Sequence, residues 1–324
     1  MTRVARSWLA FARLALLGAA LAGWALPAAS AGQTYSWVGA ASNLWSNQQN
    51  WNPEGVPGTG DSLAFPAGAP HPVQVNDLAP GTVFHIVHFN GMGYTINGNA
   101  IGLTGGVSQG GANTFNLAIT LHADLTLAGG TYNGPVDVGA FQLNLGANAH
   151  FGPVSGTGVL TAGYLVNPRF SGVHPFSGLI RGGIVLADGS FPNSSLDLLT
   201  QGVMVNGSLQ GSGTIGGDVI TNIVMPSANG SFTDPPGTLQ VGSLTLTPGM
   251  MGSSMEFLLA GAAPGMGYDQ VRVSGAVDIS PSTFLTLSLS PTFVPAMNQV
   301  FTLIDNQGTG AINGHFNGLP EGAI

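Results

Sequence analysis

The stretch "GVSQG" (106–110) has residue types and spacing that could carry out nucleophilic catalysis. It matches the G-x-S-x-G nucleophile elbow of hydrolases, with Ser108 in the position of the nucleophile. That motif works because a sharp strand-to-helix turn exposes the serine to a histidine. Here "GANTFNLAITL" (111–121) follows and continues as loop and strand. The surrounding sequence therefore argues against a nucleophile at Ser108.

Two glycine-rich stretches match ligand-binding patterns in part. "GSGTIG" (211–216) has the G-x-G-x-x-G spacing of dinucleotide sites, but the β-branched "GDVITNIVMP" follows it instead of a helix, so we expect a corner between strands. "GMGYDQV" (265–271) resembles part of a calcium nonapeptide, although Pro264 replaces the first glycine and only one copy is present. We expect Tyr268 to pack and Asp269 to face solvent or cap a turn. Structural calcium at Asp269 remains the alternative.

The histidines do not form a metal-binding pattern. His85 and His88 are three residues apart in "FHIVHF", and on a strand such side chains point to opposite faces. The chain has no cysteine, and no H-x-x-x-H spacing occurs. We therefore expect no metal site and no cofactor.

Carboxylate pairs could support glycoside hydrolysis if the chain brought them together. Adjacent turns of a coil could pair Asp188 with Asp197 or Asp124 with Asp137, whereas no D-D or D-x-D pair occurs locally. A polysaccharide lyase needs a strong base beside its acidic substrate, and lysine is absent. We expect a protein that is not an enzyme, with a polysaccharide lyase or hydrolase as an alternative.

The charge balance limits the partners. Only 6% of the residues are charged. Beyond residue 31 the cations are Arg169, Arg181 and Arg272, while all 14 acids lie there. Three scattered arginines cannot neutralise a series of phosphates, so nucleic acid and anionic lipid are excluded as partners.

Residues 1–31 have the features of a secretory signal peptide. Arg3, Arg6 and Arg13 precede the apolar run "LALLGAALAGWAL", which is too short to span a membrane. Ala29 and Ala31 occupy the small-residue positions of a cleavage site. We expect an exported chain that is secreted or at the cell surface, with no transmembrane segment after residue 31.

The rest of the chain is predicted to be all-β. Stretches with alternating apolar and polar residues, such as "FQLNLG" (141–146) and "FLTLSLS" (284–290), are separated by Gly and Asn corners. Short strands can bury their apolar faces when the chain coils and each turn covers the last. Side chains then stack about 4.8 Å apart, which favours Asn, Thr and aliphatic ladders over charged ones. The pattern predicts a parallel β-solenoid of about a dozen turns with roughly 20–25 residues each. An antiparallel sandwich or barrel is the alternative.

Three tryptophans lie close together near the start of the predicted solenoid. Trp37, Trp45 and Trp51 fall within "WVGAASNLWSNQQNW". An uncapped solenoid end exposes core and strand edges, and buried tryptophans could close it. We therefore expect a buried aromatic cap. The functional alternative is a carbohydrate-binding face in which one or more of the three rings stacks on sugars.

Several longer stretches resemble a known family. "WVGAASNLWSNQQNWNPEGVPGTGDSLAF" (37–65) resembles the opening of bacterial secreted proteins that carry autotransporter-associated β-strand repeats. Their repeat units are similar to "NGNAIGLTGGV" (97–107) and "NGSLQGSGTIGGDV" (206–219), and the last turns of their passengers to "PPGTLQVGSLTLTPG" (235–249) and "GMGYDQVRVSGAVDI" (265–279). "FTLIDNQGTGAINGHFNGLPEGA" (301–323) resembles the segment that closes their repeat region. The resemblance implies a right-handed β-helix exported to the cell surface or beyond, and it does not imply catalysis.

These observations predict a non-enzymatic, adhesin-like or structural passenger whose extracellular or cell-surface partner is unknown. The expected organisation is a signal peptide (1–31), a cap with the first turns (32–94), solenoid repeats (95–250) and C-terminal turns (251–324). In the family that it resembles, further strands usually follow the last segment. We therefore expect an incomplete passenger with a partly unpaired edge near residues 301–316, able to pair edge to edge with another chain.

Overall fold

The alternating residues form strands that bury every second side chain. In β10 (Leu125–Leu127) both leucines are buried, while Thr126 between them is exposed. In β13 (Gln142–Leu145) the two leucines are buried, and Gln142 and Asn144 lie at the surface. One face of each strand therefore contributes to a core and the other meets water.

The computed structural model describes residues 32–109, 112–163, 168–197, 199–200, 203–204, 208–227, 234–249 and 252–323. Residues 32–324 form one compact unit, and its described residues are all-β apart from the short 3-10 helix η1 (Gln48–Asn50). The predicted signal peptide at residues 1–31 lies outside the described residues. Within the described ranges, no helix has the length and apolar character needed to cross a bilayer.

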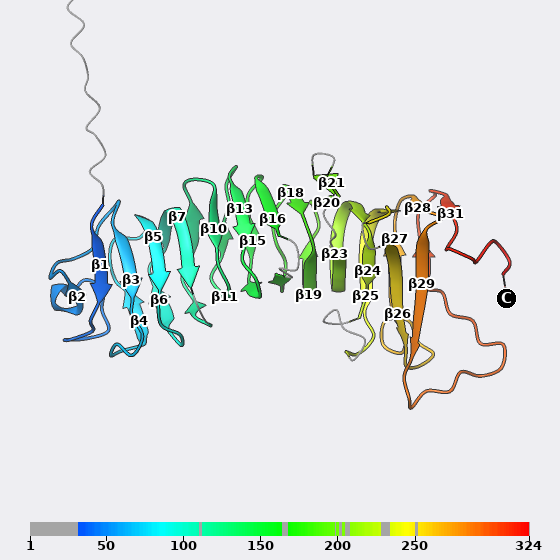
Figure 1. Ribbon diagram of the computed structural model, residues 1–324, viewed down its shortest axis with the longest axis horizontal. Helices are drawn as coiled ribbons and strands as arrows, with labels where there is room; N and C mark the ends of the chain where they lie inside the picture. Colours follow the sequence, from blue (N-terminus) through cyan, green and yellow to red (C-terminus); the bar gives the residue numbers. More distant parts are fainter. Residues whose placement is uncertain are drawn as a thin grey trace, which may run out of the picture. The chain divides into compact units, whose positions relative to one another are not determined.

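The strands are short and follow one another along the long axis of Figure 1. The first are β1 (Thr34–Trp37), β2 (Trp51–Asn52), β3 (Ser62–Phe65), β4 (Val73–Asn76), β5 (Thr82–Phe89), β6 (Thr95–Gly98), β7 (Ile101–Gln109), β8 (Thr114–Phe115), β9 (Ile119–Leu121) and β10. Next come β11 (Gly130–Tyr132), β12 (Val136–Asp137), β13, β14 (Ala149–Phe151), β15 (Val154–Ser155), β16 (Val159–Ala162), β17 (Arg169–Phe170), β18 (Leu179–Arg181), β19 (Ile184–Phe191) and β20 (Ser195–Asp197). The last are β21 (Leu199–Thr200), β22 (Val203–Met204), β23 (Ser208–Thr221), β24 (Ile223–Met225), β25 (Thr238–Leu246), β26 (Ser253–Leu259), β27 (Gln270–Val273), β28 (Val277–Ile279), β29 (Thr283–Leu289), β30 (Ile304–Asn306) and β31 (Ile312–Gly314).

Almost all of these strands pair in parallel, which confirms the predicted β-solenoid. Strands of successive turns stack in columns. One column runs through β1, β3, β5, β7, β10, β13, β16, β18, β20, β23, β25, β28 and β31. A second runs from β4 through β6, β8, β11, β14, β17, β19, β23, β24, β26 and β29. A third contains β9, β12 and β15 and, later in the chain, β25, β27 and β30. Thirteen described strands in the first column agree with the expected dozen turns.

The turns vary in length more than the sequence suggested. Asn116 and Asn133, hydrogen-bonded across adjacent turns, are 17 residues apart, whereas Asp278 and Asn313 are 35 apart. The extra residues near the C-terminal end form loops outside the strands, such as the one between β29 and β30 in Figure 1. The alignment of strands within a column depends only on the strands themselves, so the solenoid tolerates connecting loops of different length.

The core contains a ladder of stacked aromatic rings. Phe115, Tyr132, Phe151 and Phe170 occupy equivalent positions of four successive turns, with ring centroids 5.1, 5.0 and 5.4 Å apart. The rings are within 20° of parallel, and all four are buried. Their offset faces gain stacking energy on top of burial. This ladder holds adjacent turns in register.

Glycines permit the backbone to bend where a strand continues around a corner. Gly106 in β7 has φ +97, and an added Cβ would lie 2.3 Å from the Thr126 carbonyl oxygen of the next turn. "GSGTIG" (211–216) lies within β23, where Gly211 and Gly213 have positive φ and the register shifts between Ile215 and Asp218. The stretch is thus part of a bent strand with no helix after it, as its β-branched continuation predicted.

Candidate functional site

The three N-terminal tryptophans pack against one another inside the solenoid. Trp37 and Trp45 are fully buried, and Trp51 is 2% exposed. The Trp51 ring meets the other two edge to face, with centroids 5.0 Å from Trp37 and 6.0 Å from Trp45. Phe65 of the next turn contacts all three rings. None of the three presents a free ring face on which a sugar could stack.

Each indole N–H of this cluster has a buried or backbone acceptor. Trp37 Nε1 donates to the Pro70 carbonyl at 2.9 Å, and Trp51 Nε1 to the Trp45 carbonyl at 2.8 Å. Trp45 Nε1 donates to Oε1 of the buried Gln74 at 2.9 Å. The indoles are thus fixed by hydrogen bonds as well as by packing.

The residues around the tryptophans also cover the strand edges at this end. β2 pairs antiparallel with β1, and residues 43–45 form a bridge with Val75 of β4. Asn50 is buried and holds the intervening loop: its Oδ1 accepts from Ala41 N and Ser42 N. The N-terminal end of the stack is therefore closed, as expected of a cap.

Ser108, His85 and His88 all lie on strands. The nucleophile elbow would instead place its serine on a sharp turn between a strand and a helix. Ser108 is in β7, beside His88 of β5 in the parallel register. His88 Nε2 is 2.6 Å from Asn90 Oδ1, and His85 Nδ1 is 3.3 Å from Thr104 Oγ1. Among the described residues, no three His, Asp or Glu side chains gather closely enough to hold a metal ion.

The described carboxylates of the hydrolase hypothesis bind the backbone of the solenoid. Asp124 Oδ1 accepts from Gln142 N of the next turn at 2.8 Å. Asp137 Oδ1 accepts from Gly139 N at 3.0 Å and from Ser155 Oγ at 3.3 Å. Each side chain stabilises its own turn or the next one. The side chains of Asp188 and Asp197 lie outside the described residues.

The prediction that Asp269 faces solvent is wrong, because this side chain is completely buried. Its carboxylate accepts hydrogen bonds from Leu258 N at 2.7 Å, Gly237 N at 2.8 Å and Ser227 Oγ at 2.9 Å. Burial raises the pKa of Asp269, while these three donors act in the opposite direction. The carboxylate therefore links three segments, around residues 227, 237 and 258, that are distant from one another in sequence. Tyr268 is 5% exposed and packs as expected.

His174 is a buried titratable group that sequence reasoning missed. Its ring stacks on Phe191 with centroids 4.2 Å apart and meets Phe170 edge to face. Nδ1 accepts from Val154 N at 3.1 Å, whereas Nε2 is buried without a hydrogen-bond partner. Burial lowers the pKa of His174 from 6.5 to about 4, because the ring would have to carry its charge among aromatic side chains. "VHPF" offers no local signal for this, since Val154 is 20 residues earlier in the sequence.

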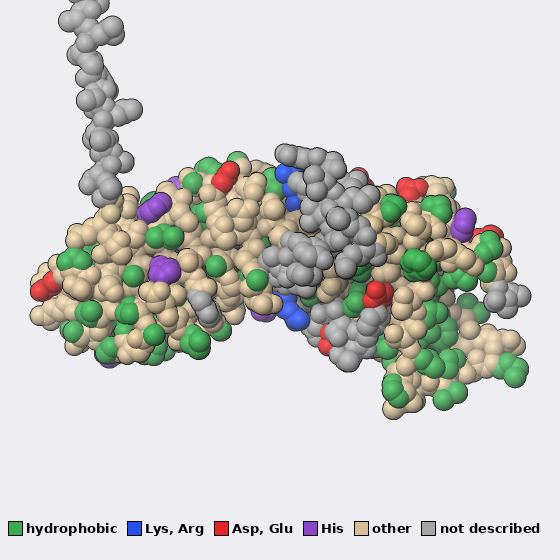
Figure 2. Space-filling view, in the orientation of Figure 1, with side chains coloured by type: hydrophobic (Ala, Val, Ile, Leu, Met, Phe, Trp, Pro, Cys, Tyr) green, Lys and Arg blue, Asp and Glu red, His purple; other side chains and the backbone are tan. Residues whose placement is uncertain are grey.

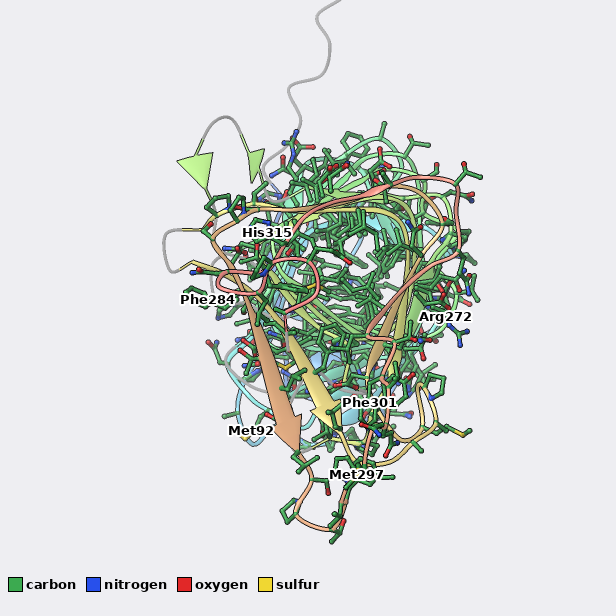
Figure 3. All side chains as sticks on the ribbon, turned by 90° about the vertical axis from the view of Figure 1, so that its right-hand side faces the viewer. Met92, Arg272, Phe284, Met297, Phe301 and His315 are labelled. Carbon is green, nitrogen blue, oxygen red and sulfur yellow. The ribbon has the colours of Figure 1, made fainter. Side chains whose placement is uncertain are left out.

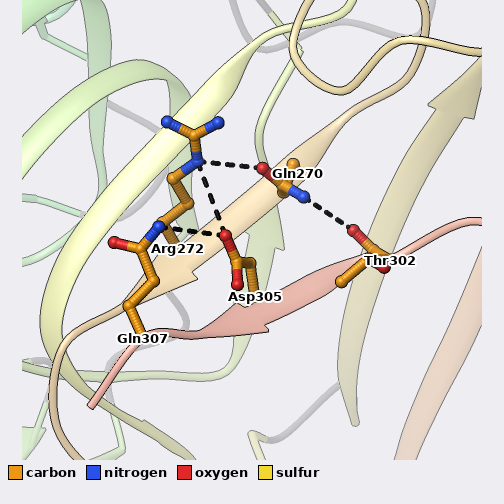
Figure 4. Close-up of polar contacts among 5 residues, drawn as sticks. All are labelled: Gln270, Arg272, Thr302, Asp305 and Gln307. Atoms are coloured by element: carbon orange, nitrogen blue, oxygen red, sulfur yellow. Dashed lines mark hydrogen bonds and ion pairs between the residues drawn. The ribbon is translucent and has the colours of Figure 1, made fainter.

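A polar network on the outer face joins the last turn to the one before it (Figure 4). Arg272 Nε of β27 donates to Gln270 Oε1 at 2.9 Å and lies 3.8 Å from Asp305 Oδ2 of β30. Gln270 Nε2 donates to the Thr302 carbonyl at 3.0 Å, and Gln307 Nε2 to Asp305 Oδ2 at 3.0 Å. The Arg272 and Asp305 side chains are 40% and 35% exposed, so this pair contributes at most about 1 kcal/mol.

The C-terminal end of the stack contains the largest group of exposed apolar side chains in the described part of the chain. Figure 2 shows hydrophobic side chains gathered over this end, around β29 and the loop that follows it. Phe284, Leu287 and Leu289 of β29 are each more than half exposed, and Met297 in the loop is 92% exposed. Exposed apolar side chains of soluble proteins are usually scattered, whereas these lie in one turn and the loop that follows β29.

No family model, no curated protein and no solved structure matches this chain. Its chemistry must therefore be read from the arrangement of its own residues. The described residues form a buried core. The carboxylates of Asp124, Asp137 and Asp269 accept hydrogen bonds from backbone N–H groups, and apolar side chains are exposed at the C-terminal turn.

Proposed function

We propose that this chain is a non-enzymatic β-solenoid that works outside the cytoplasm, as a structural or adhesin-like passenger that is secreted or held at the cell surface. One observation carries the proposal: the described polar side chains best suited to chemistry are used to hold successive turns together. Asp269 accepts three hydrogen bonds, and Asp124 and Asp137 accept from backbone N–H groups. A general acid or base needs access to a substrate proton, which the buried Asp269 lacks. Asp124 and Asp137 are exposed, and each binds the backbone through Oδ1.

The surface of the solenoid suits a passive extracellular role. Its outer face carries an amide ladder in which Asn116 bonds to Asn97 at 2.8 Å and Asn133 to Asn116 at 2.9 Å. Such neutral ladders stabilise stacking without depending on pH or salt as an ionic surface would. A chain without cysteine gains its resistance to unfolding from this stacking. The motif resemblance to passengers with autotransporter-associated β-strand repeats supports the same role.

The absence of activity can be tested directly on residues 32–324. We expect no release of reducing ends or unsaturated sugars from a panel of neutral and acidic polysaccharides. Cleavage that Asp124→Asn or Asp137→Asn abolishes would overturn the proposal and establish a carbohydrate-active enzyme. The matched control is Asp218→Asn, because Asp218 is a surface carboxylate outside the two candidate pairs that also binds the next turn, accepting from Ser243 Oγ at 2.7 Å.

Adhesion and export need separate measurements. On a glycan and matrix-protein array, an adhesin-like chain should bind at least one surface through contacts that do not involve the buried tryptophan rings. Deleting residues 2–31 should retain the protein in the cytoplasm, whereas the full chain should reach the periplasm or the medium. Export without these residues would contradict the assignment of a signal peptide.

A further inference from the structure

Two ladders of outward-facing side chains run along five successive turns in the N-terminal half of the solenoid. The sequence Thr-x-Asn recurs at β6, β8 and β11, and residues two apart on a strand face the same side. The first ladder consists of the register-matched residues Thr95, Thr114, Thr131, His150 and Arg169. The second, two residues further along each turn, consists of Asn97, Asn116, Asn133, Gly152 and Ser171. Together they form a surface that we call the ladder face.

The inner side of the same strands holds the ladder face in place. Phe115 lies between Thr114 and Asn116 in the sequence, and its ring belongs to the aromatic ladder, whose centroids are 5.0–5.4 Å apart. In Figure 3, which looks along the stack, Met92 marks the outside of the coil in the loop that leads into β6. A surface that is ordered before its ligand arrives loses little conformational entropy on binding.

The hydrogen-bonding groups of the ladder face are only partly used within the chain. In the described part of the chain, the hydroxyls of Thr95, Thr114 and Thr131 have no hydrogen-bond partner. Asn116 Nδ2 donates to Asn97 Oδ1 at 2.8 Å, and its second N–H remains for a ligand. Successive turns repeat these groups about 4.8 Å apart, and the hydroxyls of an extended pyranose chain recur at a similar interval. One sugar chain could therefore form hydrogen bonds turn after turn.

The ladder face contains no acid and carries one unpaired cation. Between residues 78 and 171 the acids are Asp124, directly before β10, and Asp137 in β12, and both strands belong to other columns. Arg169 is exposed and forms no hydrogen bond or ion pair with a described residue, although the whole chain has a net charge of −8. More distant acids are screened beyond about 8 Å at physiological salt. The guanidinium is therefore free to bind a carboxylate of a ligand through two parallel hydrogen bonds.

We propose that the ladder face binds a polysaccharide in which uronic acid units are separated by neutral sugars, extended along the solenoid with one carboxylate on Arg169. The threonine and asparagine ladders hydrogen-bond the neighbouring sugars, and Arg169 selects acidic chains over neutral ones. Spaced carboxylates suit a face with a single arginine, whereas the continuous charge of a nucleic acid does not. The inference rests on the proposed function, because it names a ligand class and a surface for an adhesin-like chain.

The assay is isothermal titration calorimetry of residues 32–324 with two hexasaccharides. The acidic probe is a hyaluronan hexasaccharide, in which glucuronate alternates with N-acetylglucosamine, and the neutral probe is chitohexaose. We expect a dissociation constant below about 1 mM for the acidic probe, at least about fivefold lower than for the neutral one. Arg169→Gln should remove this preference, as should high salt. Thr114→Val, which removes a hydroxyl and keeps the shape, should raise both constants at least about twofold.

Two matched variants outside the ladder face are the controls. Arg272→Gln removes an arginine that is 40% exposed and paired with Asp305, and Thr245→Val removes a hydroxyl from the outer face of β25. Both variants should bind the two probes as the unchanged chain does.

The outcomes separate this inference from the proposed function. The inference would be overturned if neither probe bound, if both bound equally well, or if Arg272→Gln weakened binding as much as Arg169→Gln. Binding that neither Arg169→Gln nor Thr114→Val altered would also overturn it, because the contact would lie elsewhere. In each of these cases an adhesin-like role with another ligand would still stand. Cleavage of a probe by the unchanged chain would instead overturn the proposed function, and the variants would still test the ladder face.

Discussion

Replacing Trp51 with alanine tests the tryptophan cap. A tryptophan side chain buries about 150–250 Å², which at roughly 25 cal/mol per Å² is worth about 4–6 kcal/mol before entropic costs. Trp51 is 2% exposed and also donates a hydrogen bond to the Trp45 carbonyl. Alanine would retain part of the buried area, and the end of the stack could partly collapse around the gap. We therefore expect Trp51→Ala to lower the free energy of unfolding by about 3–5 kcal/mol.

Tryptophan fluorescence during denaturant unfolding can measure this effect locally. Trp37, Trp45 and Trp51 are the tryptophans of residues 32–324, so the signal reports on the cap, whereas far-ultraviolet circular dichroism reports on all strands. Stacked turns interact mainly with their neighbours, and the cap should therefore unfold before the middle of the solenoid in the variant. The two probes should then give separate midpoints.

The control is Met92→Ala, which removes an apolar side chain that is 75% exposed. It should change the free energy of unfolding by less than about 0.5 kcal/mol. A loss equally small in Trp51→Ala would mean that the indole contributes no packing energy. The assignment of residues 37–51 as a cap would then be wrong.

Three further predictions concern other buried or exposed groups. The pKa of His174 falls from 6.5 in the unfolded chain to about 4 in the folded chain, so the unfolded chain binds more protons between pH 6.5 and pH 4. The free energy of unfolding should therefore fall as the pH is lowered, by about 2.5 kcal/mol at pH 4.5 relative to pH 7.5. His174→Phe should remove that difference in paired denaturation curves, and an unchanged pH dependence would refute it. Asp269→Ala leaves three donors without their acceptor and should lower the free energy of unfolding by about 3 kcal/mol, while a chelator should not affect the unchanged chain. Amide hydrogen exchange should be much faster over residues 296–323 than over 239–273, where strands pair on both edges, and equal protection would contradict the exposed last turn.

The strands and the burial of the tryptophans could be predicted because they depend on local residue types. Alternation in "QLNL" (142–145) places Leu143 and Leu145 inward whichever turn they occupy, and the structure buries both. The absence of charge indicated stacking for the same local reason. Turn length was harder to predict, because a loop outside a column can lengthen without disturbing the alternation on either side.

The buried polar groups could not be predicted, because their partners are distant in sequence. Asp269 bonds to residues 32 and 42 positions away, and His174 to a backbone N–H 20 positions away. "GMGYDQV" contains nothing that distinguishes a buried aspartate from a solvated one. The burial follows from the contacts of Ser227 and Gly237 with Asp269, directly before β27, and only the folded chain brings these residues together.

The open end shows the limit of periodic patterns most clearly. Leu287 and Phe257 occupy the same position in successive turns, and both are apolar, yet one is half exposed and the other buried. The pattern specifies a side chain that faces the core, and whether that core is covered depends on what lies on the next level of the stack. If water alone covered Leu287 and Leu289, polar residues at these positions would cost no burial and would lower the risk of aggregation. The leucines of β29 are therefore typical of core positions, as their register partners Phe257 and Leu259 in β26 are.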